Sequence, residues 1–229
     1  MTSSVFIHKV LRKWIKIRLQ PIRVFCLHHV CEHFDADAMY ACDWIALDAF
    51  KKKINVLRNL GYQFISLTAA YEHLKKDWFR CNKYAVLTFD DGYKSLTEVL
   101  PWLEEQKIPA TLFINGKYLD GNSYRDNPKE RYLTNDELFS LTSSLIEVGH
   151  HGWEHVDATE MSEAELIDSM QKNLEILSSH PRYIPFWAYT WGQHTEKADT
   201  CLKQVGITPV IITGHGNYNF NGLIDRELF

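Results

Sequence analysis

Short runs of β-branched and aromatic residues alternate with longer segments of helical spacing along most of the chain. We predict strands at 22–27, 62–67, 84–89, 109–114, 145–149, 183–188 and 208–212. Helices are predicted near 45–60, 68–76, 94–106, 134–144, 162–179 and 195–205. This alternation is typical of an α/β fold in which helices connect parallel strands. Seven such repeats favour a distorted, seven-stranded (β/α) barrel over a flat sheet.

Two predicted helices begin with a strong sequence signal. Thr134 is followed by Glu137, and Ser162 is followed by Glu165. A hydroxyl residue with a carboxylate three positions later is typical of a capping box, in which each side chain binds a free backbone N–H group.

The first twenty residues differ from the rest of the chain. Residues 1–20 are predicted to form a basic amphipathic helix, and residues 21–229 the barrel domain. Cations interrupt the apolar residues of this helix, so it lacks the continuous core of a secretion signal. Its apolar face, over residues 4–19, could contact a membrane surface or pack on the domain. We therefore expect a cytoplasmic protein, with the inner face of the membrane as a second location.

Composition narrows the classes of function. With 229 residues, 45% of them hydrophobic, the chain can bury one large core. A formal charge of −4 provides no basic field, so nucleic acid is not expected as a partner. The five cysteines lack CxxC spacing, which favours a reducing compartment over a disulfide framework. The oligomeric state is left open.

Conspicuous polar residues and aromatic residues follow the predicted strands. They are His28, His29, Asp90, Asp91, His150, His151, Trp191 and His215. In a (β/α) barrel the carboxyl ends of the strands converge on one mouth, where such folds place their chemistry. Segment 115–133, rich in Gly, Asn, Asp and Tyr, is the predicted substrate-facing loop.

The strongest chemical signal is the segment TFDDGY at 88–93, where an apolar strand ends in Asp90 and Asp91. Adjacent residues point in different directions, so one carboxylate can bind a cation while the other reaches a reacting water. The alternative is ordinary turn chemistry, since Asp-Asp-Gly is also common in turns.

The second signal is HGWEH at 151–155. Histidines four residues apart lie on one face of a helical turn, so His151 and His155 can hold one metal. The spacing alone is weak and could be incidental. Two histidines and one aspartate together would leave open positions for water and substrate, as in a catalytic metal site.

TFDDGY followed by GHHGWEH resembles the first two motifs of the polysaccharide deacetylases, carbohydrate esterase family four, which share the NodB-homology domain. The resemblance implies Asp90 as general base and Asp91, His151 and His155 as ligands of one divalent metal ion. Zinc is the default for such ligands, and cobalt, nickel or iron would also fit.

The family's third motif is matched loosely by FWAYTWG at 186–192. Thr190 replaces the family's proline and Trp191 its tyrosine. The resemblance implies that the backbone N–H of Trp191 stabilises the oxyanion, a role that survives a change of side chain.

The family's acid, which protonates the leaving amine, has two candidates here. FCLHHV at 25–30 resembles the first strand of the branch containing biofilm poly-N-acetylglucosamine deacetylases, which assigns the acid to His28. That resemblance covers roughly residues 22–229. The rival is His215, which follows the last predicted strand. His29 alternates to the other side of its strand and is interpreted as structural.

Three aromatic residues and one arginine complete the predicted site. Tyr93, Trp153 and Tyr189 could line a sugar-binding groove, with core packing as the alternative. Arg226 matches a region where the branch carries an arginine, which would orient Asp90; the alternative is a surface charge pair.

The resemblance implies a metal-dependent hydrolase that removes N-acetyl groups from an acetamido sugar in an oligosaccharide, polysaccharide or glycan intermediate. Two other functions remain open, an O-acetyl carbohydrate esterase and a weakly catalytic carbohydrate-binding remnant of the same fold.

Overall fold

The computed structural model describes residues 22–32, 44–77, 83–120, 131–214, 217 and 222–229. The predicted N-terminal helix, including residues 4–19 with their two expected alternatives of membrane contact or packing on the domain, lies outside these residues, and so does His215. Among the residues that are described, no helix combines the length and the apolar character needed to cross a membrane.

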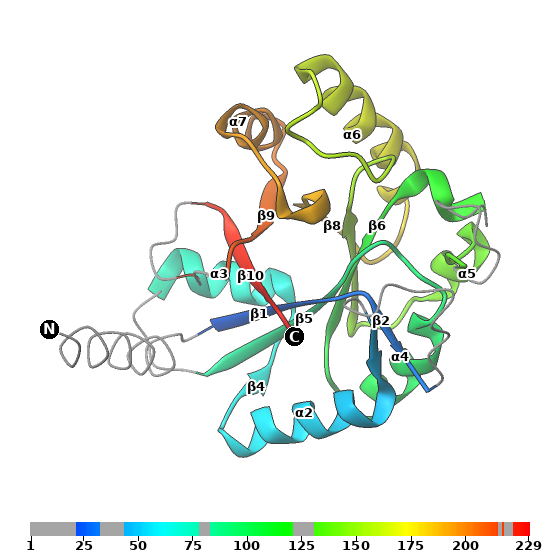
Figure 1. Ribbon diagram of the computed structural model, residues 1–229, viewed down its shortest axis with the longest axis vertical. Helices are drawn as coiled ribbons and strands as arrows, with labels where there is room; N and C mark the ends of the chain where they lie inside the picture. Colours follow the sequence, from blue (N-terminus) through cyan, green and yellow to red (C-terminus); the bar gives the residue numbers. More distant parts are fainter. Residues whose placement is uncertain (1–21, 33–43, 78–82, 121–130, 215–216, 218–221) are drawn as a thin grey trace, which may run out of the picture.

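Seven parallel strands close into a ring surrounded by helices, which confirms the predicted (β/α) barrel (Figure 1). Neighbouring strands around the ring are β1 (Ile22–Leu27), β10 (Ile224–Leu228), β9 (Thr208–Ile212), β8 (Tyr183–Ala188), β7 (Ile146–His150), β6 (Ala110–Ile114) and β5 (Tyr84–Phe89). The ring closes because β5 pairs with β1 along its whole length, from Ile22 opposite Tyr84 to Leu27 opposite Phe89.

The predicted number of strands is correct, but one member of the ring is not the one expected. The predicted strand 62–67 is reduced to β4 (Gln63–Phe64), which pairs only with the first two residues of β5. The seventh strand is β10, which the alternation did not reveal and which lies between β9 and β1. The last strand identified from sequence is therefore not the neighbour of the first.

The predicted helices are all present, some of them shorter. They are α2 (Leu47–Asn59), α3 (Leu67–Asp77), α4 (Leu96–Glu105), α5 (Asn135–Ser140), α6 (Glu163–Leu177) and α7 (Glu196–Gln204). Both predicted capping boxes form, Thr134 with Glu137 and Ser162 with Glu165. Short 3-10 turns η1 (Gly116–Asp120) and η2 (Thr190–Gly192) follow β6 and β8, and β2 (His29–Cys31) pairs with β3 (Trp44–Ala46).

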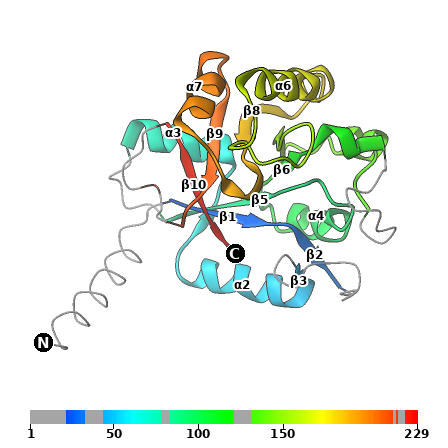
Figure 2. The same cartoon turned by 45° about the horizontal axis from the view of Figure 1, so that its top comes forward.

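Strand alternation divides the core into layers. Phe25 and Leu27 point outward and pack with apolar residues of α2 and α4, including Phe50 and Leu96. Inward-facing residues such as Val24 form a second cluster with α3. Glu147 on β7 is buried and accepts hydrogen bonds from the first backbone N–H groups of α3. Thus α3 covers the barrel end where the strands begin, while the other helices surround its sides (Figure 2).

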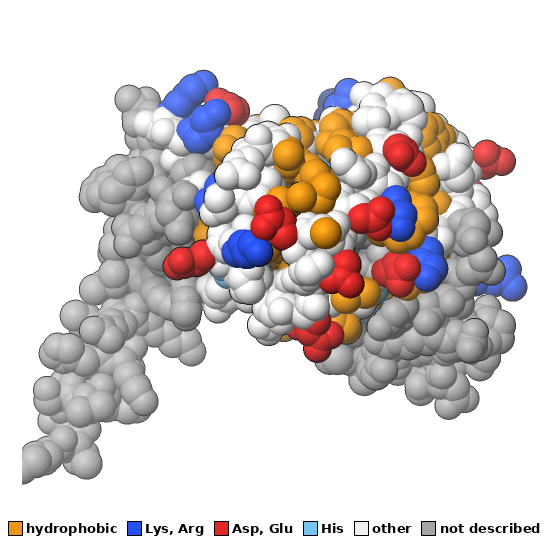
Figure 3. Space-filling model, turned by 90° about the horizontal axis from the view of Figure 1, so that it is seen from above, with side chains coloured by type: hydrophobic (Ala, Val, Ile, Leu, Met, Phe, Trp, Pro, Cys, Tyr) orange, Lys and Arg blue, Asp and Glu red, His pale blue; other side chains and the backbone are white. Residues whose placement is uncertain are grey.

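The surface over α6 and α7 carries a mixture of charges. Acidic and basic side chains are interspersed with apolar ones on the face shown in Figure 3, and no basic patch gathers among the described residues there. This distribution agrees with the near-neutral composition.

Candidate active site

The chain turns sharply where β5 ends, and the turn separates the two carboxylates of TFDDGY. The Asp90 N–H group still donates to the carbonyl of Leu27 on β1, so the strand pairing extends to the site. Asp91 and Gly92 then take positive φ angles of 70° and 81°. Aspartate tolerates this left-handed conformation better than most residues. Glycine suits position 92 because other residues are strained at this φ, and a Cβ there would also lie 2.8 Å from Cδ1 of Ile114.

The segment 151–155 is not a helical turn, contrary to our expectation. It forms a loop after β7, in which Gly152 has a φ of 86° and a Cβ would lie 2.9 Å from the carbonyl oxygen of Glu154. Asn115, directly after β6, donates from its side chain to the carbonyl of His151 over 2.6 Å. The loop, rather than helical spacing, brings the rings of His151 and His155 to the same place.

His151, His155 and Asp91 converge on one point. Oδ1 of Asp91 lies 3.2 Å from Nε2 of His151 and 3.3 Å from Nε2 of His155. The ligand atoms of the three residues all lie within 4.8 Å of one another. Oδ1 of Asp91 is buried and has no well-aligned hydrogen bond to any described residue. Two imidazole nitrogens and a carboxylate oxygen are ligands that suit zinc.

The far side of the His151 ring fixes its tautomer. Nδ1 of His151 donates to the carbonyl oxygen of Ala188, at the end of β8, over 2.8 Å. With the proton on Nδ1, the lone pair of Nε2 faces Asp91. Such a partner behind a histidine is typical of metal sites, where it orients the ring and raises its basicity. The residues present therefore fit a divalent cation.

Arg226 is the buried partner of Asp90 rather than part of a surface charge pair. Its guanidinium comes from β10 and is 1% exposed. Nη1 lies 2.5 Å from Oδ1 of Asp90, and Nη2 lies 2.7 Å from Oδ2. Nη1 also donates to the hydroxyl of Thr88 over 3.0 Å. This two-point contact fixes the orientation of the Asp90 carboxylate.

Neighbouring charges decide the protonation of the site. Burial alone would raise the pKa of Asp90, but the positive charge of Arg226 outweighs it and keeps the pKa below its ordinary value. Burial also opposes the charged form of Asp91, yet the rings of His151 and His155 close to its carboxylate hold its pKa well below the usual range. Both carboxylates are therefore ionised at neutral pH.

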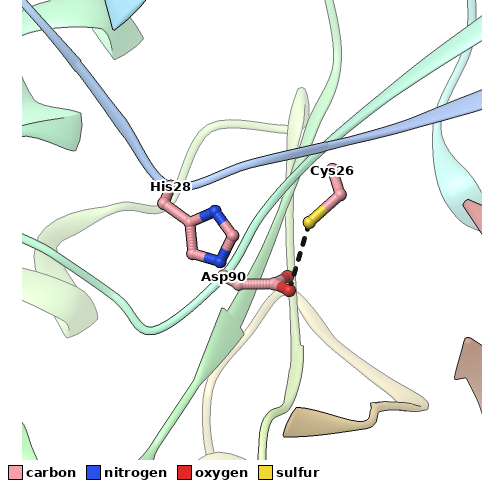
Figure 4. A group of neighbouring side chains, drawn as sticks. All are labelled: Cys26, His28 and Asp90. Carbon is pink, nitrogen blue, oxygen red and sulfur yellow. Dashed lines mark hydrogen bonds between the residues drawn. The ribbon is translucent and has the colours of Figure 1, made fainter. Parts of the chain in front are cut away.

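His28 and His29 face different environments, as their alternation predicted. His28, just beyond β1, is half-buried and lies beside Asp90 (Figure 4). His29 is buried, stacks on Tyr93 with ring centroids 3.8 Å apart, and places Nδ1 3.2 Å from the hydroxyl of Ser95. His29 thus packs in the wall of the site, whereas His28 is placed to reach a group near Asp90.

The turn after β8 presents Trp191 to the site. Trp191 has a φ of 51°, and its side chain is 54% exposed. The edge of its ring meets the ring of His155, with centroids 4.6 Å apart and planes at 88°. The side chain of Trp191 therefore lies beside one candidate metal ligand, and the role of its backbone N–H as oxyanion donor stays a prediction.

Tyr189 does not face the site, contrary to the prediction that it lines a sugar-binding groove. Its side chain is fully buried and packs in the core cluster that joins β8 and β9 to α6 and α7. The alternation of β8 explains the error, because it directs Tyr189 outward under α7. Burial, with contributions from Asp199, raises the pKa of this phenol far above its ordinary value.

Tyr93 and Trp153 keep part of their surface exposed. Tyr93 stacks between His29 and Tyr132, the latter with ring centroids 4.9 Å apart. The ring of Trp153 lies against Gly116, where a Cβ would be 2.9 Å from it. Residues 121–130 of the predicted substrate-facing loop lie outside the described residues, whereas its flanks pack on the barrel through buried Tyr118 and Tyr132. A role in sugar binding stays a prediction for Tyr93 and Trp153.

A sequence model of the family "Polysaccharide deacetylase" matches residues 80–210, more than half of the chain. The chain belongs to the polysaccharide deacetylase family. The poly-β-1,6-N-acetyl-D-glucosamine N-deacetylase of Escherichia coli is 26% identical over 148 residues, which is 61% of this chain and 22% of that protein. YxkH of Bacillus subtilis is 22% identical over 165 residues, covering 69% of this chain and 56% of its own.

Solved structures share the fold of this member of the polysaccharide deacetylase family. A de-N-acetylase from Aggregatibacter actinomycetemcomitans superposes with a TM-score of 0.72 at 19% identity, covering 91% of this chain and 94% of that one. IcaB from Ammonifex degensii gives a TM-score of 0.72 at 20% identity, covering 92% of each chain. These likenesses confirm the NodB-type (β/α) barrel.

Two residues that shape the site were missed in the sequence. Asn115 directly follows β6, just as Asp90 follows β5, so the strand-end rule already pointed to it. Cys26 lies inside β1, and its thiol is 3.4 Å from Oδ2 of Asp90. No sequence signal singled it out, because a cysteine within an apolar strand is usually core packing.

Proposed function

We propose that this polysaccharide deacetylase is a metal-dependent hydrolase that removes N-acetyl groups from acetamido sugars in an oligosaccharide or polysaccharide. The observation that carries the proposal is the convergence of Asp91, His151 and His155 beside a carboxylate, Asp90, that Arg226 holds in place. The names of the Escherichia coli relative and of the Aggregatibacter de-N-acetylase support an N-acetylated sugar as the substrate class.

Asp91, His151 and His155 would hold the metal. When bound, a divalent cation supplies a Lewis acid that polarises the acetyl carbonyl and makes water more acidic. Asp90, ionised and fixed by Arg226, takes the proton from the attacking water.

The remaining steps involve groups around the mouth of the barrel. The backbone N–H of Trp191 donates to the developing oxyanion. His28 protonates the sugar nitrogen as the C–N bond breaks, which releases acetate and a free amino sugar. Tyr93 and Trp153 contact the sugar ring through their exposed surfaces.

The position of His28 favours an amide over an ester. An amine leaves poorly unless it is protonated, whereas an alkoxide from an O-acetyl group depends less on an acid. The imidazole of His28, grouped with Asp90, can supply the proton that the amine needs in N-deacetylation. The complete carboxylate and histidine set likewise argues against a non-catalytic remnant.

Metal content and acetate release, measured on the same samples, test the proposal. His151→Ala should lose both bound metal and activity. Asp90→Asn should keep the metal and lose about a hundredfold or more in kcat, because an amide cannot act as general base. Glu154→Gln is the matched control, since Glu154 lies in the same loop but pairs with Lys117; it should keep both. Full metal occupancy in His151→Ala would overturn the assignment.

The choice of metal and acyl linkage is tested on the wild-type protein. Elemental analysis is expected to find zinc, or cobalt, nickel or iron, which suit the same ligands. Acetate release should be faster from N-acetylated than from O-acetylated oligosaccharides of the same backbone. The reverse preference would favour the esterase.

A further inference from the structure

Three ligand atoms of different chemistry meet at the mouth of the barrel, in a second group distinct from Asp91, His151 and His155. They are Sγ of Cys26, a ring nitrogen of His28 and a carboxylate oxygen of Asp90, all within 4.8 Å of one another (Figure 4). Thiolate and imidazole are the ligands that zinc and cadmium prefer, whereas magnesium and calcium prefer oxygen.

The pairing of β1 with β5 explains why these side chains meet. Leu27 lies opposite Phe89, and both point outward into the core beneath α2 and α4. Their neighbours therefore point inward on both strands, Cys26 and His28 from β1 and Asp90 from β5. The three side chains thus share the inner face of the barrel at its open end.

We propose that Cys26, His28 and Asp90 form a second cation site, which takes up a thiophilic divalent cation such as Cd²⁺, or Zn²⁺ in excess. The thiol of Cys26 donates to Oδ2 of Asp90 over 3.4 Å, so its proton occupies the space between two atoms that the cation would join. On binding, the S–H bond breaks, an S–metal bond forms, and one proton leaves to solvent for each cation taken up.

Access and charge set the strength of this second site. Cys26 and Asp90 are buried, but His28 is half-buried and gives the cation a route from the barrel mouth. Arg226 already binds both oxygens of Asp90, yet each carboxylate oxygen has a second lone pair for a metal. The positive charge of Arg226 opposes a nearby cation. The second site should therefore bind more weakly than the site at Asp91.

The consequence of binding is inhibition. A cation held by His28 and Asp90 would occupy the proposed acid and the proposed base together. This consequence rests on the proposed function, whereas uptake of the cation does not. The two are therefore measured separately, the uptake by titration and the inhibition by acetate release.

Titration of the metal-free full chain with Cd²⁺ tests the site directly. The ultraviolet charge-transfer absorption of a cadmium–thiolate bond reports the second site, and equilibrium dialysis counts the equivalents. Wild type should take up a tight equivalent without this absorption and a weaker one with it. Cys26→Ser should lose the absorption and keep the tight equivalent. His151→Ala should do the reverse.

Two further variants test whether the cation is bound by all three residues or by a single thiol. His28→Ala should weaken the second equivalent at least about tenfold, because it removes one of the three ligands. Cys201→Ser is the matched control, since Cys201 is also a buried thiol but lies on α7 outside the cluster; it should retain the absorption. Retention of the tight equivalent reports that Cys26→Ser folds, and Cys26→Ala replaces it if it does not.

Several outcomes would overturn the site. If the absorption persists in Cys26→Ser or Cys26→Ala, or if His28→Ala binds the second equivalent as wild type does, then cadmium binds other thiols. If activity is measurable, excess Cd²⁺ should inhibit wild type at a concentration at least about tenfold lower than Cys26→Ser, each compared with its own uninhibited rate. Equal sensitivity would refute the inhibition, and a wild type without deacetylase activity would refute the proposed function while leaving the titration valid.

Discussion

Replacing Arg226 with methionine should lower the free energy of unfolding by about 3–5 kcal/mol, because it leaves the Asp90 carboxylate buried without its partner. Asp90 and Arg226 are each 1% exposed, and two short contacts of 2.5 and 2.7 Å join them. Solvent cannot replace the guanidinium at that depth. The cost should therefore approach the full desolvation penalty of the carboxylate.

Arg23 provides a matched control on the same side of the barrel. It pairs with Glu227 through contacts of 2.6 and 2.7 Å and also joins β1 to β10, but the two side chains are 28% and 26% exposed. Arg23→Met should therefore cost only about 1 kcal/mol. The two pairs differ mainly in burial, so the difference between the variants isolates the desolvation of Asp90.

Urea denaturation near neutral pH, with a chelator present to remove any contribution from bound metal, measures these free energies. The double variant Arg226→Met/Asp90→Asn removes both charges and should recover at least half of the loss. It also serves as the folded reference if Arg226→Met alone does not fold. A cost below about 1 kcal/mol for Arg226→Met, or no recovery in the double variant, would refute the reasoning.

Three shorter predictions concern other features of the site. Gly92→Ala should destabilise the protein by about 1–3 kcal/mol in the same urea assay, because φ is 81° and the new Cβ would meet Ile114; an unchanged midpoint would contradict this. Burial lowers the pKa of His29 from 6.5 to about 4, so its contribution to stability is complete above pH 6.5 and is lost as the pH falls toward 4. His29 should contribute about 2 kcal/mol to the fall in the free energy of unfolding between about pH 7 and pH 5. The buried His150, whose pKa is also lowered to about 4, should contribute a similar part. His29→Gln should therefore reduce the fall by about 2 kcal/mol, whereas a fall identical to that of wild type would exclude His29 as a source. His28→Ala should slow the hydrolysis of amides far more than that of activated esters, whose phenolates leave unaided; an amide-selective defect in His215→Ala instead would transfer the acid to His215.

The local sequence was sufficient to predict most of the helices and strands. Strands β5, β8 and β9 were predicted with their observed bounds, because buried parallel strands are continuous apolar runs between turn residues. Both capping boxes were identified because a hydroxyl and a carboxylate three residues apart interact within one turn of helix. These signals depend on neighbours in the chain and need no tertiary contact.

The candidate metal group was also predictable, although the reason given for part of it was wrong. Asp91, His151 and His155 were chosen from motif spacing, and the structure brings them together. The expected helical turn is a loop, shaped by the positive φ of Gly152 and by contacts from another strand. The spacing of a motif thus predicts which residues meet, but it does not predict the backbone conformation that brings them together.

Contacts between segments distant in the sequence determined the remaining strand of the ring and the burial of the site residues. Strand β10 has the sequence IDREL, which is too polar to read as a buried strand, yet pairing with β1 and β9 makes it part of the ring. Its Arg226 lies 136 residues from Asp90 along the chain, and only the closed barrel places the guanidinium on that carboxylate. The same closure brings Cys26 to Asp90, and the packing of α6 and α7 on the outside of the barrel buries Tyr189. Residue type and local spacing therefore determined the elements and the candidate ligands, whereas the closed ring determined which polar side chains are buried together, because burial and charge pairing depend on neighbours that the local sequence does not contain.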